Sequence, residues 1–337
     1  MPETIFRHYG ENMLGIALIE GSPAVATVTV TIGDALGTAD IVAAVGPPDV
    51  QRMKSGAILV ALLAPHRNAE VVRALAERNV SSLAMELIPR TTRAQSMDAL
   101  SSQANIGGYK AALVAAAELP RYFPLLMTAA GTIKPAKVVI MGAGVAGLQA
   151  LATAKRLGAV VEVSDIRPAV KEQVQSLGGR FIDLPMQESG EGAGGYAKEV
   201  SADFLRQQRE IITRHVAAAD VVITTAQVPG KKAPVLVSRD MVEQMRPGTL
   251  IIDLAVDSGG TCELSKPGEV HHNGVRILGF TNLAATMPAD ASLLYARNVQ
   301  ALTFEFLQKS EIDLDLENEI IRGALLTHGG KVMKEIG

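Results

Sequence analysis

The segment at residues 138–147, VVIMGAGVAG, constrains the fold of this chain more than any other feature. Four apolar residues lead directly into a G-x-G-x-x-G pattern at residues 142–147. A helix-like run, LQALATAKRLG, follows, and then a second apolar run that ends on Asp165. A strand, a glycine turn, a helix and a second strand ending on an acid form the context in which this pattern predicts a dinucleotide-binding site.

Each glycine of the pattern has its own physical role. Gly142 permits the tight turn, Gly144 lets the backbone approach a pyrophosphate, and Gly147 lets helix and strand pack closely. The helix N-terminus offers unpaired N–H groups and its positive dipole end to phosphates. Asp165, 18 residues after Gly147, can accept from the ribose 2′-OH and would repel a 2′-phosphate, which favours NAD(H) over NADP(H). Arg167 weakens that preference, and a strand–helix turn that binds nothing is the alternative interpretation.

Composition excludes several other classes of protein. The 337 residues suffice for two domains, and 48% hydrophobic residues predict a large buried core. A net charge of −3 gives no sign of a surface that binds nucleic acid or inserts directly into a membrane. The single cysteine, Cys262, excludes an internal disulfide framework. No apolar run reaches the roughly 18 residues of a membrane-spanning helix, and the six histidines show no metal-ligand spacing.

Short apolar runs alternate with helix-period segments, which predicts mainly parallel sheets with helices on both faces. We therefore expect an α/β fold, and a segment irregular after residue 307. The expected strands are 25–30, 39–45, 57–63, 82–87, 137–142, 160–165, 180–184, 220–225, 249–254 and 275–280. The expected helices are 69–78, 103–118 (capped by Ser101 or Ser102), 198–218, 238–246 and 289–307.

Polar residues follow several of the expected strands. Ligands of open α/β sheets bind at the carboxyl ends of parallel strands, which share one edge. We expect that edge to carry Gly142, Asp165, Gln227, Asp253, Asp257 and Asn282. The predicted cofactor contacts of the glycine turn and the second strand are Gly142, Ala143, Gly144, Val145, Ala146, Gly147, Asp165, Ile166 and Arg167, with Asp253 added from the edge.

Several separate motifs resemble one family. They are RTTRAQSMDALS at residues 90–101, SQAN-x-x-GYKA, GAGVAGLQA, SDIRPAVKEQVQSLGG, GGYAKE, TTAQVPGKKAP and FTNLAATMPADAS. In this order and at this spacing they resemble the NAD(H)-binding component of proton-translocating NAD(P) transhydrogenase, in the form with a split α subunit. The resemblance covers roughly residues 56–310, and the alanine dehydrogenase family is a more distant relative with the same two-domain plan.

The resemblance implies two Rossmann-like, doubly wound domains joined by long helices. The first comprises residues 1–120 and 287–337, and the second, which binds NAD(H), comprises residues 121–286. Family members have a longer segment before the first polar motif, and residues 1–50 match poorly here. The resemblance therefore implies a first domain that is shortened at its N-terminus.

The resemblance also assigns roles to single residues. Arg90, Gln95 and Asp98 match the polar loop that holds the nicotinamide end of NAD(H) for hydride transfer, with Ser101 beside them. A hydride transfer needs two rings held in contact, which is a task of positioning rather than of acid–base chemistry. The remaining matches are Tyr196 in a mobile loop that closes over the nucleotide, Gln227 at the rim of the site, and Asn282 near the nicotinamide ribose.

The resemblance predicts a subunit that passes hydride between its NAD(H) and NADP(H) held by another polypeptide. It implies NADP(H)-binding and membrane-spanning partner subunits, a homodimer, and a cytoplasmic place on the inner face of the membrane. Two alternatives stay open. An alanine dehydrogenase-type enzyme could use His66, although the relatives' lysine is missing from IVAAVGPP, and a non-catalytic NAD(H)-binding protein would explain the atypical N-terminus.

Overall fold

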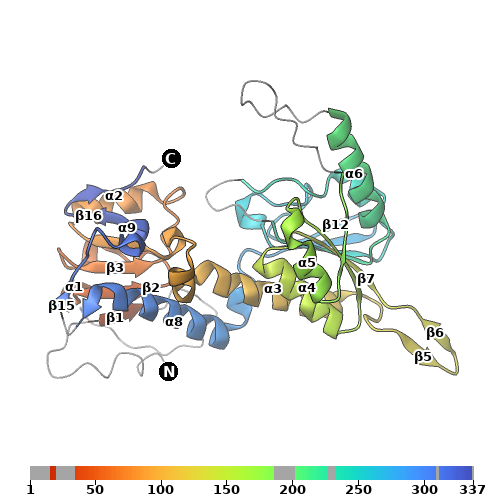
Figure 1. The fold of residues 1–337 in the computed structure, drawn as a ribbon, viewed down its shortest axis with the longest axis horizontal. Helices are drawn as coiled ribbons and strands as arrows, with labels where there is room; N and C mark the ends of the chain where they lie inside the picture. Colours follow the sequence, from red (N-terminus) through yellow and green to blue (C-terminus); the bar gives the residue numbers. More distant parts are fainter. Residues whose placement is uncertain (1–15, 20–34, 186–201, 227–231, 309–310, 336–337) are drawn as a thin grey trace. The chain divides into compact units, whose positions relative to one another are not determined.

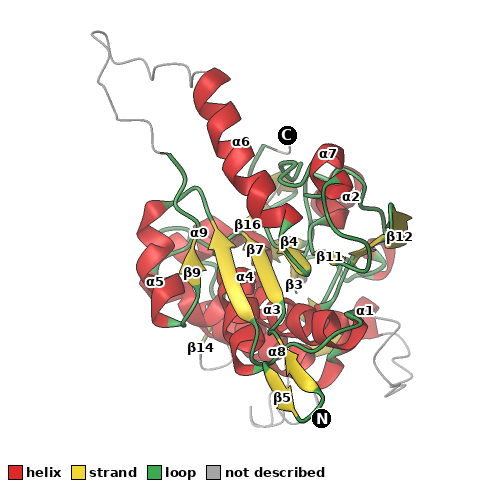
Figure 2. Cartoon of the chain, turned by 90° about the vertical axis from the view of Figure 1, so that its right-hand side faces the viewer, coloured by secondary structure: helices red, strands yellow, loops and turns green. Residues whose placement is uncertain are grey.

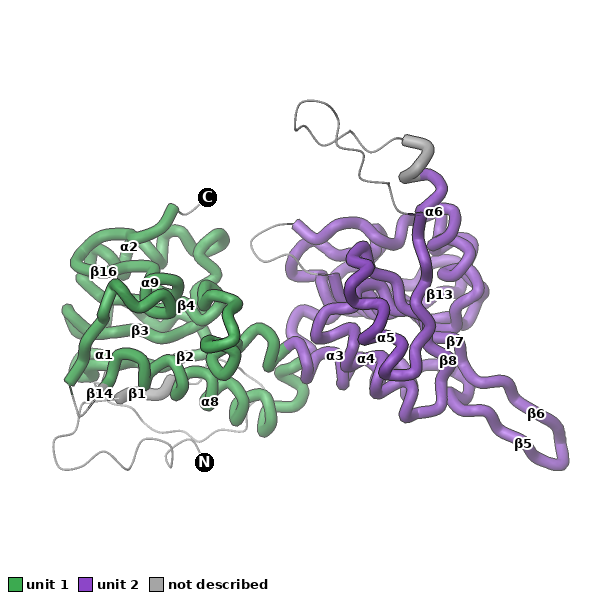
Figure 3. Tube along the Cα trace, viewed as in Figure 1, with its two compact units in different colours: residues 1–103, 284–337 green, residues 104–283 purple. Residues whose placement is uncertain are grey.

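The computed structural model describes residues 16–19, 35–185, 202–226, 232–308 and 311–335 (Figure 1). The chain divides into two compact units (Figure 3). Unit 1 comprises residues 1–103 and 284–337, and unit 2 comprises residues 104–283. The predicted second domain begins later, at residue 121, whereas residues 104–120 pack in unit 2.

Unit 1 is built on a six-stranded sheet with the order β1-β2-β3-β4-β16-β17. The first four strands run parallel, and the last two are added antiparallel. Their bounds are β1 Ile16–Ile19, β2 Ile41–Ala44, β3 Ile58–Ala61, β4 Ser81–Ala84, β16 Leu325–His328 and β17 Lys331–Val332. The expectation of an irregular C-terminal segment was therefore wrong, because short strands after residue 307 complete the sheet by pairing with β4.

Helices cover both faces of this sheet. Alternate residues of β3 point to opposite faces, so that Ile58 and Val60 pack on one side and Leu59 and Ala61 on the other. Helices α8, Pro288–Phe306, and α9, Glu319–Ala324, cover the first face, and α2, Ala69–Glu77, covers the second. The smaller elements of unit 1 are α1 Ala35–Thr38 and the antiparallel pair β14 Leu307–Gln308 and β15 Glu311–Ile312.

Unit 2 is built on a seven-stranded sheet with the order β12-β13-β11-β10-β7-β8-β9. Only β12 is antiparallel to its neighbour. The bounds are β7 Lys137–Met141, β8 Val160–Ser164, β9 Arg180–Phe181, β10 Val221–Thr224, β11 Leu250–Asp253, β12 Gly268–His272 and β13 Val275–Gly279. The chain runs outward from β7 to β9 and then returns to β10 on the other side of β7. A crevice for a ligand is expected at that switch point, beyond the carboxyl ends of β7 and β10.

The helices of unit 2 lie on both sides of these strands (Figure 2). One face carries α3, Ala99–Glu118, and α4, Val145–Arg156, and the other carries α6, Ala202–Ala217, and α7, Arg239–Glu243. Helix α5, Lys171–Ser176, packs its buried Val174 on the α4 side. Among the described helices, none is long and apolar enough to cross a membrane.

The doubly wound α/β fold was predicted correctly, with most strands within two residues of their expected bounds. The strand expected at 25–30 lies outside the described residues. Helix α3 begins at Ala99 rather than after Ser101 or Ser102, because the Asp98 carboxylate accepts a hydrogen bond from the Ser101 N–H and caps the helix. Strand β12 and a hairpin of β5, Leu126–Thr128, with β6, Gly131–Ile133, were not predicted.

Candidate dinucleotide site

The glycine turn lies at the switch point of the unit 2 sheet. Gly142 follows β7 with φ +108°, a backbone conformation that favours glycine. Its N–H donates to the Ser164 carbonyl at 2.8 Å, and the Thr225 hydroxyl donates to its carbonyl at 3.1 Å. Ser164 ends β8 and Thr225 follows β10, so the turn is held between the ends of the two strands that flank β7.

The start of helix α4 is packed too closely for side chains at two glycines. A Cβ at Gly147 would lie 1.8 Å from the Gly142 carbonyl oxygen. A Cβ at Gly108, in helix α3, would lie 2.1 Å from the Ala146 carbonyl oxygen. The first turn of α4 is therefore fixed between the glycine turn and α3. Gly108 lies within a motif that carried the family resemblance, but its packing role could not be predicted from the sequence.

The middle glycine has the opposite surroundings. A Cβ at Gly144 would meet no atom within 4 Å, and its φ of −78° suits any residue, so neither packing nor strain requires glycine there. Gly144 is the N-cap of α4, which has neither a side-chain cap nor an acid in its first turn. The N–H groups of that turn thus face open space at the positive end of the helix dipole. These residues fit a pyrophosphate.

Asp165 is fixed against the same turn. Its Oδ2 accepts from the Ala143 N–H at 2.7 Å and from Arg167 Nη2 at 2.9 Å, and its Oδ1 accepts from Arg167 Nε at 2.9 Å. Burial acts to raise the pKa of this carboxyl, but the hydrogen bonds from Arg167 and Ala143 outweigh it and lower the pKa below the usual value. The charged acid therefore stands directly beside the predicted pyrophosphate position. Ile166, next in sequence, is 87% exposed.

Asp253 does not take the role expected of it. Its side chain is fully buried, and its two oxygens accept from five donors at 2.6–2.9 Å. The donors are the backbone N–H groups of Ala255, Thr261 and Cys262 and the hydroxyls of Thr261 and Ser265. All acceptor sites of the carboxylate are thus used to hold the loop after β11. We remove Asp253 from the predicted cofactor contacts for this reason.

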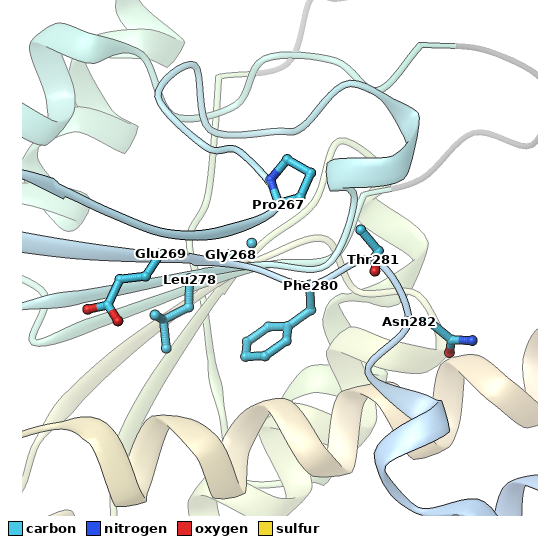
Figure 4. Close-up of a pocket in the computed structure, with 8 residues that line it drawn as sticks. Pro267, Gly268, Glu269, Leu278, Phe280, Thr281 and Asn282 are labelled. Carbon is cyan, nitrogen blue, oxygen red and sulfur yellow. The ribbon is translucent and has the colours of Figure 1, made fainter. Parts of the chain in front are cut away.

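Asn282 lies at the same edge of the sheet, on the loop after β13. It lines an open cavity of about 400 Å³ together with Pro267, Phe280 and Thr281. In Figure 4, Leu278 and Phe280 point to the same side of β13, and Asn282 lies beyond the end of the strand. This location leaves Asn282 available for a ligand, whereas the predicted residues Tyr196 and Gln227 lie outside the described residues.

The predicted polar loop belongs to unit 1. Arg90 and Gln95 are exposed, on the segment that contains a 3-10 helix at Thr92–Met97. Asp98 and Ser101 lie together, because the Asp98 Oδ2 accepts from the Ser101 hydroxyl at 2.6 Å. Asp98 therefore has a structural role as the cap of α3, in addition to the role that the resemblance implies.

Two residues of helix α8 hold this loop from behind. Asn298, which is buried, donates from Nδ2 to the Ser96 carbonyl at 2.8 Å. Glu305 accepts from Arg93 and, at 2.9 Å, from Asn318 Nδ2. Both lie about 200 residues from the loop in sequence. No sequence pattern indicated either residue, because only the folded chain brings α8 to the loop.

The described residues contain no group of three or more histidines, cysteines or acids that could hold a metal ion. Cys262 is buried, and burial raises the pKa of its thiol to about 11. The thiol is therefore protonated near neutral pH, and a reactive thiolate is not available.

Strand order, glycine turn and fixed acid define unit 2 as a dinucleotide-binding module of the Rossmann type. Comparison with known proteins gives the family. Residues 23–107 match the N-terminal domain and residues 111–335 the C-terminal domain of alanine dehydrogenase/PNT. The chain belongs to the alanine dehydrogenase/PNT family.

Individual relatives narrow the comparison. The chain is 47% identical to the first of the polypeptides that form the split NAD(P) transhydrogenase subunit alpha of Rhodospirillum rubrum, over 91% of this chain and 84% of that protein. A transhydrogenase structure from Sinorhizobium meliloti matches with a TM-score of 0.79 at 44% identity, covering 88% of this chain and 82% of that one. Alanine dehydrogenase of Mycobacterium tuberculosis is 28% identical, over 84% of this chain and 73% of that protein.

The family predicted from the sequence motifs is thus confirmed, and with it the assignment to NAD(H)-using oxidoreductase components. One detail of the prediction was wrong. The match to the family's N-terminal domain begins at residue 23, within the stretch that showed a poor match by motif alone. Motifs of polar and glycine residues locate binding loops, whereas a run such as AVATVTV carries only a hydrophobic pattern.

Proposed function

We propose that this protein is the NAD(H)-binding subunit of a proton-translocating NAD(P) transhydrogenase. It passes hydride between its own NAD(H) and NADP(H) bound to a partner polypeptide. The observation that carries the proposal is the glycine turn at the switch point, with Gly144 facing open space and Asp165 held beside it. The high identity to a polypeptide of a transhydrogenase subunit alpha supports the same conclusion.

Each residue set has its own task in this proposal. The first turn of α4 binds the pyrophosphate, and Asp165 accepts from the adenosine ribose beside the exposed side chain of Ile166. Arg90, Gln95 and Asp98 orient the nicotinamide end, with Ser101, Asn282, Tyr196 and Gln227 as further contacts. The bound nicotinamide supplies the hydride. The protein contributes positioning and the exclusion of water.

The assembly belongs to the same proposal. The described helices include none that could cross a membrane, so the proton path and the NADP(H) site are assigned to partner subunits. The chain then acts as a homodimer at the inner, cytoplasmic face of the membrane. Its two domains are residues 1–120 with 287–337 and residues 121–286, and the first α3 residues after Gln103 belong physically to the NAD(H)-binding domain.

The proposal is tested by hydride exchange between NADH and an NADP⁺ analogue. The full chain is mixed with an NADP(H)-binding transhydrogenase subunit, and each component is also measured alone. We expect transfer only in the mixture, and loss of transfer with retained NADH binding in Gln95→Ala. Tight NADH binding without transfer in any mixture would instead support a non-catalytic NAD(H)-binding protein.

An alanine dehydrogenase-type activity is the second candidate. His66 is exposed on the loop after β3, where it could act as an acid–base group. The relatives' lysine has no counterpart in this chain, and the named alanine dehydrogenase relative is only 28% identical. NADH oxidation by the chain alone, dependent on pyruvate and ammonia, would favour this candidate over the first.

Asp165→Asn is expected to weaken NADH binding and to reduce the discrimination against NADPH. A hydrogen bond to a charged group contributes about 1.5–3 kcal/mol, so the dissociation constant for NADH should rise roughly 10-fold or more. Because the pKa of Asp165 is lowered, its contribution is present above that pKa and is lost only as pH falls through it. NADH affinity should accordingly stay constant from pH 8 to about pH 5.

Fluorescence titration with NADH and with NADPH measures both effects. Asp183→Asn provides the matched control, since it removes the same charge from a side chain that is 69% exposed. An Asp165→Asn protein that binds NADH as tightly as the control would contradict the role assigned to the acid.

A further inference from the structure

The hairpin β5–β6 projects from the body of unit 2 with apolar side chains in solvent (Figure 1). Residues 122–133, YFPLLMTAAGTI, contain no charged residue. Tyr122 and Leu125 are each 54% exposed, Met127 is 73% exposed and Ile133 is 40% exposed. Such a concentration of exposed apolar side chains on an uncharged segment is typical of an interaction surface.

The base of the hairpin is firmly held. Phe123 is buried in the core beside α3 and α4, and its carbonyl accepts from the Ala136 N–H at 3.0 Å. Pro124 packs on Gly158, where a Cβ would lie 2.6 Å from the proline Cβ. The direction of the hairpin is thus set by the core of unit 2.

Arg121 ties the same base to the sheet. Its Nη1 donates to Asp220 Oδ1 at 2.7 Å, and its Nη2 donates to the Lys134 carbonyl at 3.3 Å. Asp220 is buried and also accepts from Arg246 Nη2 and from the Lys137 N–H, each at 2.8 Å. Both ends of the hairpin are therefore anchored to one buried carboxylate at the amino edge of the sheet.

The outer half of the hairpin lacks comparable support. Leu126 pairs with Ile133 and Thr128 with Gly131, and no third strand joins this pair among the described residues. A two-stranded hairpin is at best marginally stable alone in water, and an open apolar strand edge invites another chain. An anchored base with an uncovered apolar outer half is the form expected of an arm that packs against another molecule.

We propose that this hairpin is the docking arm through which two copies of the chain form a dimer. The inference deepens the homodimer of the proposed function by naming its surface. The arm carries no charge, so it gains nothing from a strongly charged partner and avoids repulsion between two copies that each have a net charge of −3. In a two-fold dimer the same surface is used by both copies, and each arm covers the other subunit.

The size of the surface is sufficient for a stable dimer. The four exposed side chains offer on the order of 400 Å² per arm, given that large side chains bury about 150–250 Å² each. Two exchanged arms, each covering an equal area of its partner, bury about 1,600 Å² in total, which is the size of a standard stable interface.

The test is the molar mass of the full chain in solution, by light scattering over a dilution series. The natural sequence should have about 71 kDa, twice the chain mass of 35.5 kDa. In Met127→Lys a charge replaces the most exposed apolar side chain of the arm, and the dimer dissociation constant should rise at least 100-fold. Leu177→Lys, on a residue of unit 2 that is 40% exposed outside the hairpin, is the matched control and should stay dimeric.

The outcomes separate the two proposals. A natural chain that is monomeric at all concentrations overturns the dimer itself, without affecting NADH binding or hydride exchange. A Met127→Lys protein that stays dimeric, with thermal unfolding and NADH affinity equal to the control, overturns the hairpin as the interface. If the chain is monomeric alone and Met127→Lys loses only its binding to transhydrogenase partner subunits, the occupant is a different polypeptide and the second copy is excluded.

Discussion

Gly147→Ala is expected to destroy NADH binding and to destabilise unit 2. The added Cβ would lie 1.8 Å from the Gly142 carbonyl oxygen, and both atoms belong to backbone or are fixed to it. Either the glycine turn or the first turn of α4 must move, which costs about 1–3 kcal/mol or more in a packed region. The N–H groups that bind the pyrophosphate then move with it, and we expect at least a 100-fold loss of NADH affinity.

Gly144→Ala is the matched control, because it adds the same methyl group three residues earlier. That Cβ would meet no protein atom within 4 Å, and φ is −78°, so the free energy of unfolding should change little. NADH affinity should nevertheless fall, because the methyl group occupies the space reserved for the pyrophosphate. Urea unfolding and NADH titration separate the two effects. Unchanged NADH affinity in Gly144→Ala would contradict the proposed binding mode.

Asp253→Ala is expected to lower the free energy of unfolding by about 3–5 kcal/mol, because it leaves several buried donors without an acceptor. The loop from Ala255 to Ser265 loses the only group in the described structure that all five donors share. Asp253→Asn retains one oxygen and should lie between the natural protein and the alanine variant.

Chemical denaturation measures this loss, with Asp183→Ala as the surface control that should stay within about 0.5 kcal/mol. NADH affinity of the folded Asp253→Asn protein distinguishes the structural role from the cofactor role that the strand-end position suggested. An Asn variant of full stability with weakened NADH binding would restore Asp253 to the cofactor contacts.

The sequence predicted the nucleotide half of the site well, because its residues are neighbours in the chain. The glycine turn, helix α4 and the acid at the end of β8 form one continuous βαβ unit, and local spacing determines their geometry. The same reasoning misplaced Asp253. An acid at the end of a parallel strand looks like a ligand contact, and nothing in the spacing shows that Thr261 and Ser265 fold back onto it.

Residues that act over long sequence separations were missed for a related reason. Asn298 and Glu305 reach the polar loop only because α8 packs on the unit 1 sheet. The C-terminal strands β16 and β17 are four and two residues long, too short to show a period, and they form because β4 offers an open edge.

The sequence by itself determined the α/β class, the position of the nucleotide turn and the family, since hydrophobic period, glycine spacing and motif order are local properties. Only the tertiary structure decided which polar groups are free for a ligand and which are used internally. Asp253 is consumed by five internal hydrogen bonds, whereas Gly144 faces open space. The same holds for the β5–β6 hairpin, whose apolar residues read like core in the sequence but are exposed in the fold. Burial and hydrogen-bond partners depend on contacts between distant segments, and the linear pattern does not contain them.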